Sequence, residues 1–243
     1  MAPERTYTYP YPRPSVTVDC VVFGFDASDV EDPLKVLLIR RKDNPFKGRW
    51  ALPGGFVNVQ DDADQGEDLE AAARRELAEE TSIEVDYLEQ LYTFGAPKRD
   101  PRGRVISVAY LALVRRADHE AHAGSDASDA VWTSCRLDST RLAFDHDRIL
   151  AVATERLRTK VRYAPIGFNL LPEVFTLSEL RRLYEGLLGR KIDPSNFRKK
   201  MLTTGVVIET GDTRSGQHRP SPLFRFDPEA YEKSVREGFN FEV

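Results

Sequence analysis

The stretch from residue 54 to residue 83 constrains the fold more than any other part of this 243-residue chain. It begins with a glycine pair, continues through an acidic loop, and then places Leu69, Ala73 and Leu77 at every fourth position. That spacing predicts a helix with one buried stripe, because residues four apart lie on the same helical face.

Three glutamates, Glu76, Glu79 and Glu80, share another side of the predicted helix. Carboxylates in such close proximity repel one another and weaken the helix unless a cation neutralises them. Their hard oxygen atoms are ligands that suit Mg²⁺ or Mn²⁺. A solvated acidic face is the alternative, and the helix alone does not decide between the two.

The length of the chain allows one large domain or two modest ones. With 41% hydrophobic and 30% charged residues, we expect a folded protein rather than a disordered one. No apolar run approaches the roughly 20 residues of a membrane span, and the first residues lack the apolar core of a secretory signal. Cys20 and Cys135 lie far apart in strand-like sequence and are expected to be reduced. We therefore expect a cytoplasmic protein with no membrane partner.

Residues 1–14 are rich in tyrosine and proline and are expected to form an extended arm before the first domain. Alternating residues predict a strand at Ser15–Phe25. The apolar run Leu34–Arg40 predicts a second, more buried strand, and Glu89–Gly95 and Val105–Val114 are expected to form an antiparallel pair. An apolar face repeated at helical spacing predicts a further helix over Phe144–Lys160.

The connection between the last two predicted strands, residues 96–104, is strongly basic. It carries Arg99, Arg102 and Arg104 together with Lys98. Cations beside a cluster of carboxylates suit a substrate that bears phosphate groups. An ordinary charged hairpin tip is an equally open alternative.

The acidic helix resembles the motif of the Nudix hydrolase family. That motif is glycine, five residues, glutamate, seven residues, and then Arg-Glu-apolar-x-Glu-Glu-x-Gly-apolar. In this chain Glu67 stands seven residues before the run Arg75-Glu76-Leu77-Ala78-Glu79-Glu80-Thr81-Ser82-Ile83. The resemblance implies a Nudix α/β/α sandwich over roughly residues 15–160 and cleavage of a diphosphate linked to a nucleoside.

The resemblance also implies which residues carry the chemistry. The expected catalytic set is Glu67, Arg75, Glu76, Glu79 and Glu80. Glu76, Glu79 and Glu80 would hold Mg²⁺ or Mn²⁺, and the ions would activate an attacking water. Arg75 could orient a glutamate through a charge-assisted pair, while the general base stays unassigned. The expected substrate-binding residues are Gly54, Gly55, Arg99, Arg102 and Arg104.

Two departures from the motif bear on turnover. Eleven residues separate Gly55 from Glu67 where the motif has five, and the insertion carries Asp61, Asp62 and Asp64. Ser82 stands where the motif has a glycine in a left-handed turn, a conformation that costs serine roughly 1–2 kcal/mol. Neither departure removes a metal ligand, but both bear on how the glycine loop closes over substrate, so we expect them to affect turnover more than binding.

The last part of the chain, residues 161–243, follows the order of a winged helix-turn-helix domain. Thr176 and Glu179 form a capping box before one helix, and Asp193-Pro194 begins a second. Two short strands and a basic hairpin between them follow, at residues 206–226. The expected fold class is therefore α/β, a Nudix sandwich followed by a winged helix-turn-helix domain.

Positive charge is concentrated in this part of the chain, with 10 basic and 4 acidic residues between Arg181 and Arg225. In a winged helix the second helix enters the major groove of double-stranded DNA and the wing contacts phosphates. The expected DNA-binding residues are Ser195, Asn196, Arg198, Lys199, Lys200, Arg214, Gln217, His218 and Arg219. A module for protein interaction is the alternative.

The whole chain resembles the Nudix-related transcriptional regulators of NAD metabolism. The similarity extends to the Tyr/Pro arm and to the runs Arg99–Arg102, Phe175–Leu180, Asn196–Lys200 and His218–Pro220. It implies a homodimer that binds ADP-ribose through the Nudix domain and a palindromic operator through the winged helix. Some similar proteins keep hydrolase activity and others have a damaged motif. The alternatives are a hydrolase whose winged helix is an accessory or oligomerisation module, and a protein-interaction scaffold.

Overall fold

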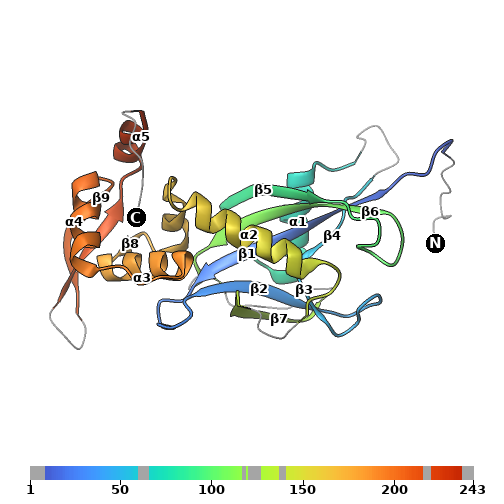
Figure 1. Cartoon of the computed structure of the whole chain (residues 1–243), viewed down its shortest axis with the longest axis horizontal. Helices are drawn as coiled ribbons and strands as arrows, with labels where there is room; N and C mark the ends of the chain where they lie inside the picture. The colour runs from blue at the N-terminus through green and yellow to red at the C-terminus, as the bar shows by residue number, and fades with distance from the viewer. Residues whose placement is uncertain are drawn as a thin grey trace.

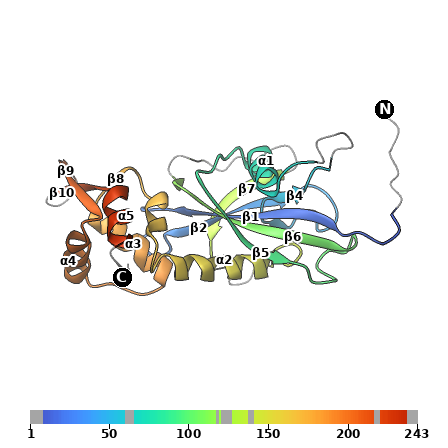
Figure 2. The ribbon, with the colours of Figure 1, turned by 90° about the horizontal axis from the view of Figure 1, so that it is seen from above.

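The computed structural model describes residues 9–59, 66–116, 119, 127–136, 141–215 and 220–236. The first part of the chain forms a seven-stranded sheet with a helix on each face (Figures 1 and 2). Its elements are β1 (Ser15–Phe25), β2 (Leu34–Arg41), β3 (Trp50–Ala51), β4 (Gly54–Phe56), α1 (Leu69–Thr81), β5 (Tyr87–Phe94), β6 (Val105–Val114), β7 (Ala127–Ser134) and α2 (His146–Lys160).

The strand β1 lies at the centre of this sheet. The order is β3-β2-β1-β6-β5, with β4 paired to β1 and β7 paired to β2. β1 runs parallel to β6 and antiparallel to β2 and β4. Its side chains alternate between the two faces: Val18 and Cys20 share an apolar cluster with Leu77 of α1, and Phe23 shares one with Leu157 of α2. The expected α/β/α sandwich is thus confirmed.

Residues with left-handed backbone conformation set where α1 ends and where α2 begins. Ser82 ends α1 with φ 56°, and its N–H donates to the carbonyl oxygen of Ala78 at 3.0 Å, so serine does adopt the left-handed turn. The second helix begins at His146 rather than at Phe144, because Phe144 has φ 53° and cannot belong to a right-handed helix.

The second part of the chain confirms the expected winged helix fold. Its elements are the 3-10 helix η2 (Pro165–Leu170), β8 (Val174–Phe175), α3 (Leu177–Leu188), α4 (Pro194–Thr204), β9 (Val207–Arg214), β10 (Ser221–Phe226) and α5 (Pro228–Arg236). The strand order is β8-β10-β9. Thr176 and Glu179 form the complete capping box of α3, and the Asp193 side chain caps α4 by accepting from the N–H of Asn196.

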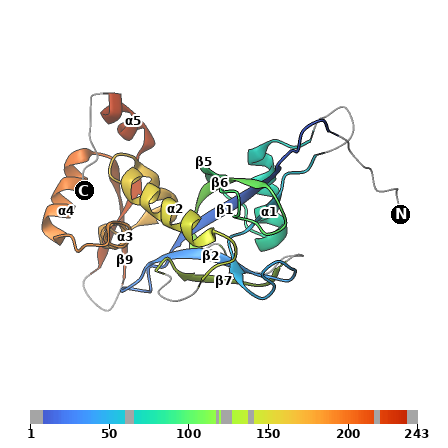
Figure 3. The ribbon, with the colours of Figure 1, turned by 45° about the vertical axis from the view of Figure 1, so that its right-hand side comes forward.

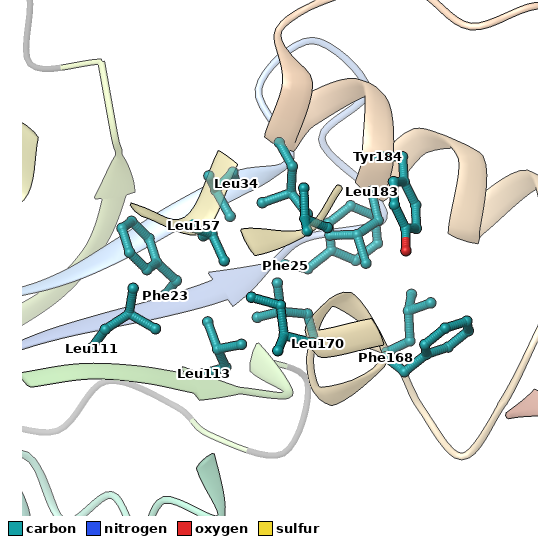
Figure 4. Close-up of a cluster of buried hydrophobic side chains, with 14 of the residues drawn as sticks. Phe23, Phe25, Leu34, Leu111, Leu113, Leu157, Phe168, Leu170, Leu183 and Tyr184 are labelled. Atoms are coloured by element: carbon teal, nitrogen blue, oxygen red, sulfur yellow. The ribbon is translucent and has the colours of Figure 1, made fainter. Parts of the chain in front are cut away.

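The two parts share one continuous apolar core (Figure 4). It joins Phe23, Phe25, Leu34, Leu111, Leu113 and Leu157 to Phe168, Leu170, Leu183 and Tyr184. The Arg158 guanidinium on α2 donates to the carbonyl oxygen of Leu187 on α3 at 3.2 Å. The boundary expected between residues 160 and 161 stays a prediction, but the packing runs across it.

The helix α4 lies at one end of the molecule, and α1 lies on the sheet, well away from it (Figures 1 and 3). Between them, α2 runs along the sheet from the neighbourhood of β3 to α3 (Figure 1). Within the described residues, the helices are too short or too polar to traverse a lipid bilayer.

Candidate functional site

The glycine pair brings β4 close to both β1 and α1. Gly54 has φ +151°, and a Cβ atom there would lie 2.2 Å from the carbonyl oxygen of Val18. A Cβ atom on Gly55 would lie 2.4 Å from Oε1 of Glu76. The Gly54 N–H donates to Oε2 of Glu80 at 2.8 Å. The backbone therefore needs glycine at position 54, Gly55 leaves room for the Glu76 carboxylate, and the turn holds Glu80 through its N–H.

Arg75 contacts three of the motif's four glutamates. Its guanidinium forms a bidentate pair with Glu67, at 2.6 and 2.9 Å, and single contacts with Glu76 at 2.8 Å and Glu79 at 3.0 Å. These contacts raise the pKa of Arg75, chiefly through Glu67, and the same hydrogen bonds lower the pKa of Glu67. Four of the five expected catalytic residues thus meet at one point, while Glu80 faces the glycine turn.

The carboxylate of Glu76 is the one most affected by its surroundings. Burial raises its pKa, Arg75 opposes that shift, and repulsion from Glu79 and Glu67 adds to it. A divalent cation beside Glu76 would offset the cost of burying its negative charge and would reduce its repulsion from Glu79 and Glu67. The absence of a side chain at Gly55 leaves room for the carboxylate. The oxygen donors therefore fit Mg²⁺ or Mn²⁺.

Arg75 occupies the space between these carboxylates. Within the described residues, no three His, Cys, Asp or Glu side chains already form a metal-binding group. Arg75 would have to release at least one of its carboxylates for a cation to bind. The inserted aspartates 61, 62 and 64 lie outside the described residues.

In the basic connection, residues 96–104, the arginines contact other parts of the protein. The Arg99 side chain is only 3% exposed, and its Nη2 contacts Asp19 at 3.1 Å and Asp145 at 2.8 Å. Two carboxylates already neutralise this buried guanidinium, so Arg99 supports the fold from within, and its expected contact with substrate stays a prediction. Arg102 pairs with Asp100 at 2.7 Å but stays partly exposed, and Arg104 donates to the carbonyl oxygen of Gly95.

Arg99 belongs to a buried polar network beneath the glycine turn. Nδ1 of His146 accepts from the N–H of Leu52 at 2.9 Å, and its Nε2 lies 3.4 Å from Asp19. Burial lowers the pKa of His146, so the ring is neutral and its Nε2–H points to Asp19. Ser107 also donates to Asp19. The network connects the first residue of α2 to the strand that leads into the site.

Two aromatic side chains at this end of the sheet were not expected from the sequence. Phe46 and Phe144 both have left-handed backbones, with φ 65° and 53°, and their rings meet edge to face at 4.9 Å. Such conformations cost a non-glycine residue energy and concentrate at functional sites. No local pattern marks them, since phenylalanine is not a residue that ordinarily favours positive φ.

The expected DNA-binding residues fall into three groups. Ser195, Asn196, Arg198, Lys199 and Lys200 are exposed on α4, whose Phe197 and Met201 are buried. None of the three cations has an ion pair within the described residues. Arg214 is paired with Glu179 at 2.5 Å and so attaches β9 to α3. Gln217, His218 and Arg219 lie outside the described residues.

Comparison with known proteins places both parts of the chain. Residues 13–152 match the NUDIX domain, and residues 167–226 match the NrtR DNA-binding winged helix domain. The chain is 40% identical over 234 residues to the ADPR responsive transcriptional repressor NtrR of Acinetobacter baylyi, covering 95% of this chain and 87% of that protein.

Two further proteins resemble all or part of the chain. The crystal structure of Shewanella oneidensis NrtR complexed with a 27mer DNA superposes with a TM-score of 0.75 at 37% identity, covering 89% of this chain and 95% of that one. The ADP-ribose pyrophosphatase of Methanocaldococcus jannaschii is 40% identical over 140 residues, 58% of this chain and 73% of that enzyme. The chain therefore belongs to the Nudix family, in the branch that joins a NUDIX domain to an NrtR-type DNA-binding winged helix domain.

Proposed function

We propose that the protein is an ADP-ribose-responsive, DNA-binding transcriptional regulator of NAD metabolism that acts in the cytoplasm. The observation that carries this proposal is that one chain combines a Nudix site, in which Arg75 contacts three of the motif's glutamates, with a winged helix that exposes cations on α4. The winged helix shares an apolar core with the α2 face of the sheet, while α1 with its glutamates packs on the opposite face (Figure 2). The relatives named for ADP-ribose response and crystallised with DNA support the same assignment.

The DNA-binding surface would be the exposed side of α4. Arg198, Lys199 and Lys200 can each neutralise a phosphate without breaking an ion pair within the described residues, and Ser195 and Asn196 stand at the helix start, which contacts base edges in a winged helix. Double-stranded DNA is therefore the proposed macromolecular partner. The homodimer and the palindromic operator stay predictions.

A gel shift with palindromic promoter fragments from NAD genes tests the regulator. We expect Lys199→Glu/Lys200→Glu to weaken binding about a hundredfold or more and to reduce the salt dependence, because two phosphate contacts become repulsive. Lys47→Glu/Lys98→Glu, with the same change in net charge on the Nudix domain, should bind like the wild type. ADP-ribose should change the affinity of the wild-type complex.

The regulator proposal fails if no fragment binds in a salt-sensitive way. It also fails if the two double variants lose affinity equally, since net charge rather than α4 would then govern binding. A protein that hydrolyses ADP-ribose but never binds DNA would be the alternative, a hydrolase with an accessory winged helix.

We further propose that the Nudix site cleaves ADP-ribose, because every glutamate of the motif is present and three of them converge on Arg75. Glu76, Glu79 and Glu80 would hold Mg²⁺ or Mn²⁺, which when bound polarises a phosphorus–oxygen bond and lowers the pKa of water. The chain itself would contribute Arg75, which orients the carboxylates, and the glycine turn, which leaves room for Glu76 and holds Glu80.

Phosphate-coupled turnover of ADP-ribose with Mg²⁺ tests this activity. We expect Glu79→Gln to lower the rate at least a hundredfold, because the neutral amide is a poorer ligand for a divalent cation. Its melting temperature should change little, since the side chain is half exposed. Glu84→Gln, an exposed glutamate just beyond the helix, is the matched control. Equal rates for both variants and the wild type would reject catalysis by this motif.

A further inference from the structure

A cavity of about 320 Å³ opens where the two parts of the chain meet. Its lining comes from the residue after β6, from η2 and the connection that follows it, and from β8 and β10 of the winged helix. We call this cavity, between Arg115, Phe168, Phe175, Arg225 and Phe226, the junction pocket. Its volume is within the range of sites that hold small molecules, roughly 300–1,000 Å³. Within the described residues, nothing from the glycine turn, α1 or α4 lines it, so it is separate from the Nudix motif and from the DNA-binding surface.

One wall of the junction pocket is aromatic and is fixed from behind. The rings of Phe168 and Phe226 stack with their centroids 4.3 Å apart and their planes 21° apart, and Phe168 also packs against Phe175 at 5.6 Å. Phe168 and Phe175 are buried in the core that the two parts share, and Figure 4 shows Phe168 at the margin of the labelled core residues. Tyr231 of α5 packs against Phe226 at 6.1 Å. A ligand therefore meets a wall that is already formed, which lowers the entropic cost of binding.

Two arginines, one from each part of the chain, line the same pocket. Arg115 follows the last residue of β6, and Arg225 belongs to β10. Both are exposed, and within the described residues neither has an ion pair. The next arginine in the chain differs, because Arg116 pairs with Asp26 at 2.5 Å. The guanidiniums of Arg115 and Arg225 are therefore available to an anion that enters the pocket.

The lining indicates the chemical class of that anion. Guanidinium groups bind planar carboxylates through paired hydrogen bonds, and aromatic walls favour a flat apolar body. Glu173 also lines the pocket, which leaves one net positive charge beside the two arginines. Its carboxylate would repel a ligand with several negative charges, such as a diphosphate. A ring that carries a single carboxylate satisfies all three conditions.

We propose that the junction pocket is a binding site for a small aromatic carboxylate. The carboxylate lies between Arg115 and Arg225, and the ring packs on the aromatic wall at Phe226. Such a ligand contacts both parts of the chain at once. The proposal is independent of the function of the Nudix site and of the α4 surface, since neither contributes a described residue to the pocket.

Calorimetric titration of the full-length protein tests the site with naphthalene carboxylate, with its neutral carboxamide and with inorganic phosphate. We expect the carboxylate to bind the wild type at least tenfold more tightly than the carboxamide, because only the carboxylate forms charge-assisted hydrogen bonds with the arginines. Inorganic phosphate, which lacks the apolar body, should bind more weakly than the carboxylate. The same experiment requires no DNA and no ADP-ribose, so its result does not depend on the proposed function.

The variants separate the contribution of charge from that of the ring. Arg115→Gln and Arg225→Gln should each weaken carboxylate binding about tenfold and leave carboxamide binding unchanged. Phe226→Leu should weaken binding of both probes by the same factor, roughly threefold to tenfold. Arg162→Gln, which removes an exposed arginine just after α2, is the control for the change in net charge and should bind like the wild type. The melting temperature of each variant shows whether it is folded.

Several outcomes would overturn the junction pocket as a carboxylate site. They are an absence of carboxylate binding to the wild type, equal affinities for carboxylate and carboxamide, and a loss in Arg162→Gln as large as that in Arg225→Gln. An equal loss of both probes in the arginine variants would mean a structural role and would also overturn it. If Phe226→Leu does not fold, the arginine variants and their control still decide the question.

Discussion

Replacing Gly54 with alanine is expected to destabilise the protein by about 3 kcal/mol or more. The new Cβ would lie 2.2 Å from the carbonyl oxygen of Val18, and the φ of +151° is unfavourable for any L side chain. Val18 belongs to the central strand β1, which cannot move aside without disturbing its pairing with β6. Urea denaturation monitored by far-UV circular dichroism measures the loss.

Gly55→Ala is the matched comparison for this experiment. The three atoms nearest to its Cβ would all belong to the carboxylate of Glu76, the far end of a side chain that can turn away. We expect a stability loss below about 1 kcal/mol, the range of ordinary surface changes, but a marked loss of ADP-ribose binding or turnover. Equal destabilisation by the two replacements would contradict the different roles assigned to the two glycines.

Leu183→Ala is expected to cost about 2–5 kcal/mol and to weaken both parts of the chain together. Leu183 belongs to α3 but is fully buried in the shared core with Leu157 and Phe25. Both tryptophans, Trp50 and Trp132, lie in the Nudix part, so their fluorescence reports that part alone. The midpoint temperature measured by fluorescence should decrease by the same amount as the midpoint measured by circular dichroism.

Leu202→Ala provides the control, because Leu202 is an exposed leucine on α4. It should change the midpoint little by either signal. A Leu183→Ala protein in which fluorescence keeps the wild-type midpoint while circular dichroism shows a separate, earlier transition would mean that the two parts unfold independently.

The elements that the sequence predicted well are those governed by local rules. The helix after the glycine pair, the left-handed Ser82, the capping box at Thr176 and the Pro194 start of α4 each depend on a few neighbouring residues. Local spacing also placed Glu67, Glu76 and Glu79 within reach of Arg75.

The ion pairs of Arg99 and Arg214 could not be predicted, because their partners lie far away in the sequence. The basic character of residues 96–104 suggested phosphate contacts, but Asp19 and Asp145 turn Arg99 inward. Arg214 likewise finds Glu179 across the winged helix. Asp19 was an available signal, because it is the one charged residue in β1.

The helix α2 connects the network beneath the glycine turn to the winged helix. Its first residue, His146, is fixed in the network beneath the glycine turn, and near its other end Arg158 holds α3. Fifteen residues span about 22 Å, so a tilt of about 5° at His146 displaces the far end by roughly 2 Å. We therefore expect a change in the network around His146 to reach α3 through α2.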